Sequence, residues 1–197
     1  MKPLEQPATL KGASTRERIL IGARAQLVAQ GYEAFVMREL AETLGMKLGN
    51  LQYYFKTRES LVFHVIEMEA AKDVEVIESH LQAGASPMTA FSAVVNDLVT
   101  RWRGNTGVLF STLTALSMHN TSFRQLYIDI YSRFYAALEK LVHEVNPALS
   151  DEENTIRVRM ITSLIDGSSM QIQVGDRQHF LDCVQSHARA IAVADPH

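Results

Sequence analysis

Cysteine, proline and long apolar runs are all scarce in this chain of 197 residues. Cys183 is its single cysteine, which excludes an intramolecular disulfide and a cysteine-rich metal site. The five prolines leave long stretches of helix-forming residues uninterrupted, so the composition favours an all-α fold. No apolar run reaches the roughly 18 to 20 residues that span a bilayer, and the opening residues lack a signal-peptide pattern. We therefore expect a cytoplasmic protein without membrane contact.

Motifs of catalysis and metal binding are also missing. The sequence contains no Gly-rich phosphate loop, no nucleophile elbow and no HExxH motif. Its seven histidines are scattered, and no two of them lie one helical turn apart as metal ligands commonly do. We expect no enzymatic activity, no metal and no cofactor.

Charge is distributed unevenly around a net charge of −3. Residues 1–60 hold nine basic and six acidic residues, whereas the remainder holds ten and sixteen. A basic first third on an acidic body indicates an end that faces DNA and a second part with another role. Chance is the alternative, because the basic excess over residues 1–60 is only three charges.

Helical periodicity with clear start and stop signals runs through most of the chain. Ser14 and Glu17 form a capping-box pattern, Ser86-Pro87 is a typical helix start, and Gly31 is a typical helix stop. Strand-like alternation is not found. The pattern predicts about nine helices, at about residues 14–30, 37–44, 48–55, 57–83, 86–103, 106–118, 121–145, 150–174 and 178–193.

The order of these helices predicts three parts. Residues 1–13 lack periodicity and hold two prolines, so we expect a flexible arm there. Residues 14–60 contain three short helices and predict a helix-turn-helix DNA-binding domain. A fourth helix of about 26 residues would be roughly 39 Å long, which is enough to join this domain to a second helical domain at residues 61–197.

The stretch MRELAETLGMKLGNLQYYFKTRE, residues 37–59, is the most informative part of the sequence. It predicts two short helices joined by a tight turn, the second with polar and aromatic side chains on an exposed face. Leu51 and Phe55 would hold this second helix in place, while Gly49 would let its backbone approach bases closely. A helix of this kind, held by a packed partner, is how a small protein reads DNA.

Residues 15–67 resemble the DNA-binding domain of TetR-family transcriptional regulators. The resemblance is carried by Gly31-Tyr32, by Met-Arg-Glu-Leu-Ala at 37–41, by Gly-x-Leu-x-x-Tyr-Phe at 49–55 and by Arg58. Outside this part only the architecture matches, together with an Asp166-Gly167 step in the eighth helix. The resemblance implies that residues 61–197 form a ligand-binding and dimerisation domain.

The expected DNA contacts lie on and beside the third helix. Lys can bind guanine or a phosphate, Asn can pair with adenine, and Gln and Tyr can donate to phosphates. The alternatives are that Tyr53 and Tyr54 are packing aromatics and that the nearby basic residues form a solvated surface pair. The predicted DNA-binding residues are Arg38, Lys47, Leu48, Gly49, Asn50, Gln52, Tyr53, Tyr54, Lys56 and Arg58.

Three positions depart from the family pattern. Phe35-Val36-Met37 stands where a helix-capping Thr or Ser is usual, and Lys47 stands where a capping Ser is usual. Gln52 replaces the usual Tyr after Leu51. Phosphate contacts are therefore distributed differently, and the operator sequence does not transfer from a relative.

Helices five to seven are rich in aromatic residues, which are packing residues first. The resemblance implies an effector cavity among helices four to eight, and an aromatic and aliphatic lining would suit a small apolar or aromatic effector. The alternative is a filled core without an effector. The candidate ligand contacts are Asn96, Trp102, Phe110, Met118, His119, Tyr127, Tyr131 and Asp166.

The last two predicted helices each carry an apolar stripe. The resemblance implies that these stripes pair in a homodimer, which would place two recognition helices on a palindromic site. Alternatively, the same stripes bury inside one subunit. The candidate interface residues are Ile161, Leu164, Ser168, Ile172, Phe180, Val184, His187 and Ile191.

Taken with the resemblance, the sequence predicts a ligand-responsive transcriptional repressor. It would bind palindromic double-stranded operator DNA as a homodimer and be released by a small-molecule effector that displaces the long fourth helix. The alternative is an all-α small-molecule-binding or enzymatic protein whose helix-turn-helix no longer reads DNA. Steep salt dependence of DNA binding distinguishes the first from the second.

Overall fold

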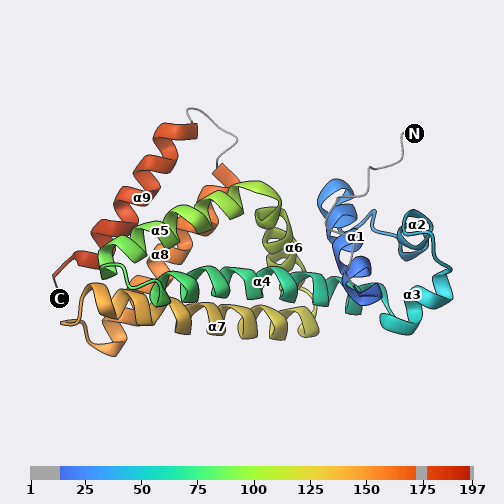
Figure 1. Cartoon of the computed structure of the whole chain (residues 1–197), viewed down its shortest axis with the longest axis horizontal. Coiled ribbons are helices and arrows are strands. Elements are labelled where there is room, and N and C mark those ends of the chain that lie inside the picture. Colours follow the sequence, from blue (N-terminus) through green and yellow to red (C-terminus); the bar gives the residue numbers. More distant parts are fainter. Residues whose placement is uncertain (1–13, 172–176, 196–197) are drawn as a thin grey trace. The chain divides into compact units, whose positions relative to one another are not determined.

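The computed structural model describes residues 14–171 and 177–195, and the regular structure within these ranges is all helical (Figure 1). The predicted all-α fold is confirmed. The predicted arm at residues 1–13, Ile172 and the predicted end of the eighth helix lie outside the described residues. The helices are α1 (Thr15–Gln30), α2 (Met37–Thr43), α3 (Leu48–Tyr54), α4 (Arg58–Gln82), α5 (Pro87–Arg101), α6 (Gly107–Ser117), α7 (Thr121–Val145), α8 (Asp151–Gln171) and α9 (Arg177–Val193), with a short π-helical segment η2 (Trp102–Thr106).

The chain divides into two compact units, unit 1 at Met1–Glu67 and unit 2 at Met68–His197. Helix α4 begins in unit 1 and ends in unit 2. Over residues 14–171 and 177–195, none of the helices is both long enough and apolar enough to cross a membrane.

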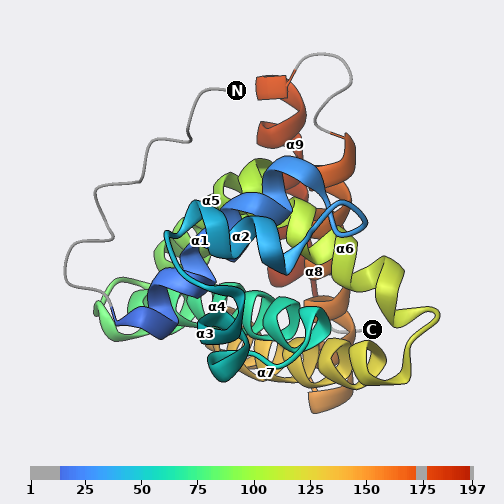
Figure 2. The same ribbon diagram turned by 90° about the vertical axis from the view of Figure 1, so that its right-hand side faces the viewer.

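Unit 1 contains α1, α2, α3 and the first turns of α4 (Figure 2). The predicted capping box opens α1: Ser14 Oγ accepts from the backbone N–H of Glu17 at 3.3 Å, and the backbone N–H of Ser14 donates to the Glu17 carboxylate at 2.6 Å. Gly22 allows α1 and α2 to pack closely, because a Cβ there would lie 3.0 Å from Leu44 Cδ2. The buried core includes Ile19, Leu20, Ala23, Leu27, Phe35, Leu40, Ala41, Leu51 and Phe55.

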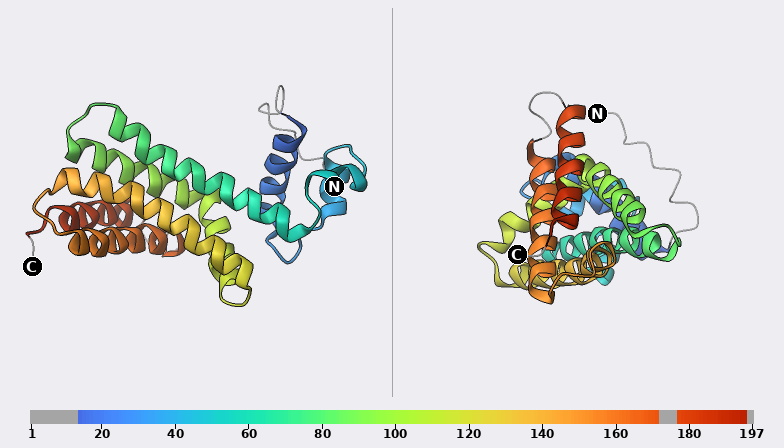
Figure 3. Two further views of the ribbon diagram at one scale, coloured as in Figure 1. Left: turned by 90° about the horizontal axis from the view of Figure 1, so that it is seen from below. Right: turned by 90° about the vertical axis from the view of Figure 1, so that its left-hand side faces the viewer.

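Helix α7 is central to unit 2. It packs against α5, α6 and α8, and α8 in turn packs against α9 (Figure 3). The Asn120 side chain caps α7 by accepting from two backbone N–H groups of its first turn. The buried Arg157 guanidinium on α8 donates to the carbonyls of Ile191 and Ala194 at the end of α9, at 3.1 and 2.6 Å. These side chains satisfy helix-end groups that have no partner within their own helix.

A kink separates α5 from α6 at the place where Gly104-Asn105 predicts a break. Gly104 has non-helical dihedral angles, φ −91° and ψ −143°, inside η2. Gly107 leaves no room for a side chain, because a Cβ there would collide with the carbonyl oxygen of Trp102. The kinked segment buries Trp102 and Thr106, and both donate hydrogen bonds to carboxylates of α4.

Candidate functional sites

Helix α3 has one buried side and one exposed side. Leu51 and Phe55 are 0% and 1% exposed and fix the helix to the rest of unit 1. The opposite side is open to solvent except for Leu48, which is half-buried. We call this side the α3 surface; it comprises Lys47, Leu48, Gly49, Asn50, Gln52 and Tyr53.

The turn before α3 aims this surface outward. Gly45 takes the left-handed conformation (φ 66°) that glycine adopts without strain, and the Met46 N–H donates to the Ala41 carbonyl at 2.9 Å. Val36 and Lys47 are the N-cap residues of α2 and α3, and neither side chain makes a capping hydrogen bond. Both helices therefore begin without a side-chain cap, as the sequence predicts. The N-cap position of α2 is Val36 rather than the buried Phe35.

The tyrosines of α3 are surface residues. Tyr53 is 83% exposed and Tyr54 is 41% exposed, and their rings meet edge to face with centroids 5.3 Å apart. Together with Thr15, Met46 and Asn50 they border a shallow groove beside the helix. Packing in a core does not explain a ring as exposed as that of Tyr53, so its aromatic face and hydroxyl are available to a partner.

The predicted basic contacts differ in their surroundings. Arg38 and Lys56 are exposed, as expected for residues that reach phosphates. Arg58 is half-buried, and its guanidinium lies over the Tyr32 ring, 4.2 Å from the centroid. Arg58 therefore stabilises unit 1 through a cation–π contact in addition to any role with DNA.

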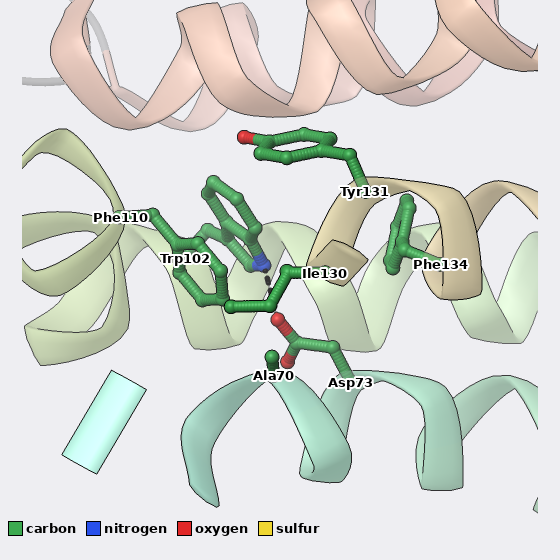
Figure 4. Close-up of a pocket in the computed structure, with 7 residues that line it drawn as sticks. All are labelled: Ala70, Asp73, Trp102, Phe110, Ile130, Tyr131 and Phe134. Atoms are coloured by element: carbon green, nitrogen blue, oxygen red, sulfur yellow. Dashed lines mark hydrogen bonds between the residues drawn. The ribbon is translucent and has the colours of Figure 1, made fainter. Parts of the chain in front are cut away.

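Three of the predicted ligand contacts meet inside unit 2. Trp102, Phe110 and Tyr131 border a cavity with about 10 Å³ of room, which is roughly enough for one water molecule. The Trp102 and Phe110 rings stack with centroids 4.4 Å apart. Figure 4 shows how side chains from α4, α6 and α7 converge on this space, here called the closed cavity. Its complete lining is Ala70, Asp73, Trp102, Phe110, Ile130, Tyr131 and Phe134.

Two carboxylates of α4 lie in this interior, and reasoning from the sequence missed both. Asp73 is almost fully buried and accepts from Arg101 Nε at 2.7 Å and from Trp102 Nε1 at 2.9 Å. Glu69 is equally buried and accepts from Lys72 Nζ at 2.6 Å and from Thr106 Oγ1 at 3.1 Å. The two residues are four positions apart and lie in register with the apolar stripe of α4, and this spacing was the feature of the sequence that could have indicated their burial.

Asp166 forms the third carboxylate of this interior. Its Oδ2 accepts from the Tyr131 hydroxyl at 2.8 Å, and Tyr131 stacks on Tyr127 with centroids 4.4 Å apart. Burial, helped by the charge of Asp73, raises the pKa of Asp166 from its ordinary 3.8 to about 7, although the hydrogen bond from Tyr131 opposes the rise. Burial also raises the pKa of Asp73, against the lowering effect of its hydrogen bond from Arg101.

The other predicted ligand contacts lie elsewhere. Met118 and His119 are exposed after the end of α6 and do not line the closed cavity. Asn96 is exposed on α5, where its side chain donates to Asp97 at 3.3 Å and accepts from Gln185 at 3.1 Å. The aromatic part of the predicted set thus comes together around Tyr131, whereas these three residues stay at the surface.

The predicted dimer residues also divide. Ile161, Ser168 and Val184 are buried within unit 2, because α8 and α9 pack on each other and on α7 or α5. Leu164, Phe180 and Ile191 are half-buried, and His187 is exposed. A different row of α8 residues faces solvent: Ile156, Met160 and Met170 are about half exposed, with Leu164 and Gly167 between them. We call this row the α8 stripe.

Comparison with known proteins supports the resemblance noted from the sequence. Residues 19–65 match the profile of the family described as bacterial regulatory proteins, tetR family. The transcriptional repressor AcnR of Corynebacterium diphtheriae is 26% identical over 184 residues, which cover 89% of this chain and 92% of that protein. AcnR of Corynebacterium glutamicum is 31% identical over 70 residues, which cover 36% of this chain and 37% of that protein.

Solved structures show the same fold. A TetR transcriptional regulator from Legionella pneumophila superposes with a TM-score of 0.74 at 21% identity, covering 89% of this chain and 96% of that one. The profile match extends from α1 into α4 and therefore includes the whole α3 surface. The profile match, the similarity to AcnR and the shared fold together support a TetR-family transcriptional regulator.

Proposed function

We propose that this protein is a transcriptional repressor that binds palindromic operator DNA as a homodimer and is released by a small-molecule effector. The observation that carries the DNA-binding part is the division of α3, with Leu51 and Phe55 fully buried and a polar, aromatic side exposed except at Leu48. Relatives that match along most of this chain or over 70 of its residues are named as repressors, which supports repression over activation.

Different residues of the α3 surface suit different parts of DNA. Asn50 is exposed and has the amide that pairs with adenine in the major groove. Gln52 and Tyr53 are exposed donors suited to phosphates, and Lys56 adds a positive charge beyond the end of the helix. Specificity would thus depend on Asn50 and Lys47, and affinity on the surrounding donors.

The closed cavity supports an effector site in unit 2. Four of its seven lining residues are aromatic, as in pockets that take small organic molecules. Its size accommodates only about one water molecule, so a larger effector has to displace side chains as it binds. Release of DNA then requires that the effector prefer one of two conformations, since a ligand with equal affinity for both shifts nothing.

The α8 stripe supports the homodimer. Ile156, Met160 and Met170 recur at helical spacing, and a row of half-exposed apolar side chains is suited to pairing with a second copy. Substituting Met160 by arginine should convert a dimer to monomers in sedimentation velocity at micromolar concentration. Ile128→Arg on α7 is the matched control, because Ile128 is exposed to a similar extent and lies outside the stripe. An unchanged dimer in the Met160 variant would rule out this interface.

Selection of bound fragments from the source genome, followed by titrations at several salt concentrations, tests DNA binding. Lys56→Ala should weaken binding about equally for all sequences and reduce the salt slope by about one, whereas Asn50→Ala should mainly relax sequence preference. Lys140→Ala on α7 removes the same charge from an exposed site in unit 2 and serves as the control. Binding that is no stronger for any genomic fragment than for random DNA would overturn the repressor assignment.

A further inference from the structure

Two of the three carboxylates described above have cationic partners. Glu69 pairs with Lys72 at 2.6 Å, and Asp73 pairs with Arg101 at 2.7 Å. Among the described residues, Asp166 forms no ion pair: its Oδ2 accepts from the neutral Tyr131 hydroxyl, and its Oδ1 is buried without a hydrogen-bond partner. Buried charges are normally paired, and the ionised form of Asp166 has no cation to pair with among the described residues.

The unpaired carboxylate lies next to the closed cavity. Asp73 and Tyr131 border the cavity from α4 and α7, on opposite sides in Figure 4. Asp166 accepts from the Tyr131 hydroxyl at 2.8 Å, and the charge of Asp73 contributes to raising the pKa of Asp166. A group that displaced the Tyr131 hydroxyl would therefore meet the Asp166 carboxylate, with Asp73 on the cavity wall.

Aromatic faces complete these surroundings. Trp102 and Phe110 stack on one part of the wall, and Phe134 lies on another. Such faces attract cations through the quadrupole of the ring as well as apolar groups through burial. An anion would meet Asp73 on the cavity wall, and the described residues contain no group of ligands that could hold a metal ion.

We propose that the closed cavity takes a small organic ammonium ion, with its charged head between Asp73 and Asp166 and its apolar body against Trp102, Phe110 and Phe134. The ammonium N–H groups would donate to Asp166 Oδ1 and supply the missing charge. This inference rests on the proposed effector response and changes the expected effector from an uncharged apolar molecule to a cation with an apolar body.

Because Asp166 can carry a proton, the proposed binding should release protons, which can be measured. Since its pKa is about 7, close to half of the molecules carry a proton on Asp166 at neutral pH. The groups that face it are Tyr127, Tyr131 and Tyr135 from α7, whose pKa values are raised by burial, and Asp73 from α4. A bound cation stabilises the ionised form, so binding at pH 7 should release about half a proton.

Matched compounds that differ only in the head group test the proposal on the full-length protein. Benzylamine, benzyl alcohol and benzoate form one series, and cyclohexylmethylamine with its alcohol and acid forms a second. Calorimetry at pH 7.5 should show that each amine binds at least about tenfold more tightly than its alcohol, as charged hydrogen bonds are stronger than neutral ones, and that the acids bind weakest. Titrations in buffers of different ionisation enthalpy at pH 7 should report the released proton.

Asp166→Asn should remove the amine preference, because it keeps the shape and the acceptor for Tyr131 but not the charge. Asp129→Asn makes the same change of charge at an exposed site of α7 and should leave the preference intact. Thermal unfolding of both variants checks that they are folded. Equal binding of an alcohol or acid in either series, absence of amine binding, or an unaltered preference in Asp166→Asn would each overturn the proposal.

Operator release measured on the same samples separates this inference from the proposed function. Amines that bind without releasing DNA would leave the ammonium site standing and refute the effector response. DNA release by uncharged compounds alone would leave the effector response standing and refute the ammonium site.

Discussion

Replacing Asp166 by asparagine should change how the stability of the protein depends on pH. In the folded protein, burial raises the pKa of Asp166 from 3.8 to about 7, so folding favours the protonated carboxyl. The resulting stabilisation is fully present below pH 3.8 and is lost as the pH rises through 7. Asparagine cannot ionise, so the variant does not lose this contribution.

The size of the effect follows from the same values. Each tenfold change in an ionisation constant corresponds to about 1.4 kcal/mol. The stabilisation that the parent loses between low and high pH is therefore roughly 4 kcal/mol, and about 3 kcal/mol of it is lost between pH 4.5 and 8.5. The asparagine side chain places an N–H₂ group near the site of the unpartnered Oδ1, which costs about 1 to 3 kcal/mol at every pH. The parent has lost about 1 kcal/mol of this stabilisation at pH 4.5 and about 4 kcal/mol at pH 8.5, so the variant should be equally or less stable than the parent at pH 4.5 and more stable at pH 8.5.

Urea denaturation followed by circular dichroism, at fixed protein concentration and ionic strength, measures this difference at each pH. Asp129→Asn, which makes the same substitution at an exposed carboxylate of α7, is the matched control. A carbon-detected NMR titration gives the pKa of Asp166 directly. If the free-energy difference between the Asp166 variant and the parent is flat from pH 4.5 to 8.5, the burial argument is wrong.

Two further predictions concern unit 1. Gly49→Ala should raise the free energy of unfolding by about 0.5 to 1 kcal/mol in calorimetry, because no heavy atom lies within 4 Å of the added Cβ. The same substitution should lower operator affinity about tenfold in DNA titrations if the backbone approaches the bases, and unchanged affinity would refute this close approach. Val36 is the N-cap of α2, has an extended conformation (φ −120°, ψ 119°) and lacks a capping hydroxyl, so Val36→Thr should raise the free energy of unfolding by about 1 kcal/mol in denaturant titrations. A lower free energy of unfolding would contradict the capping argument.

Helix ends were predictable because capping is a local interaction. Ser14, Ser86 and Ser150 each begin a helix where the sequence predicts it, and each accepts from the backbone N–H three residues later. The two sides of α3 were predictable for a similar reason, since Leu51 and Phe55 are spaced to lie together on one side of a helix. Neither inference requires knowledge of residues far away in the chain.

The exposed face of α8 was not predictable from its own sequence. Ile161 and Ser168 lie on a row that α9 and α7 cover, whereas Ile156, Met160 and Met170 lie on another row with comparable apolar character. Periodicity shows that a helix has apolar rows, but the neighbouring helices decide which row is buried. The predicted interface candidates Ile161 and Ser168 lie on the inward row, whereas Leu164 lies on the outward one.

The carboxylates of α4 required the same tertiary knowledge, and they bear on the chemistry of the effector. Charged residues on a helix are usually solvated, but Asp73 is paired with Arg101 and Trp102, which lie 28 and 29 residues further along the chain. Buried ion pairs contribute little net stability, because desolvation offsets their attraction and apolar replacements are often as stable. Folding alone therefore does not explain acidic groups beside a cavity that apolar residues would fill equally well. The proposed binding of a cation would explain them, since a site for a charged ligand needs the opposite charge in place before the ligand arrives. The aromatic residues visible in the sequence indicate a place for an apolar body, and the acidic residues found only through the fold indicate the charge that such a ligand carries.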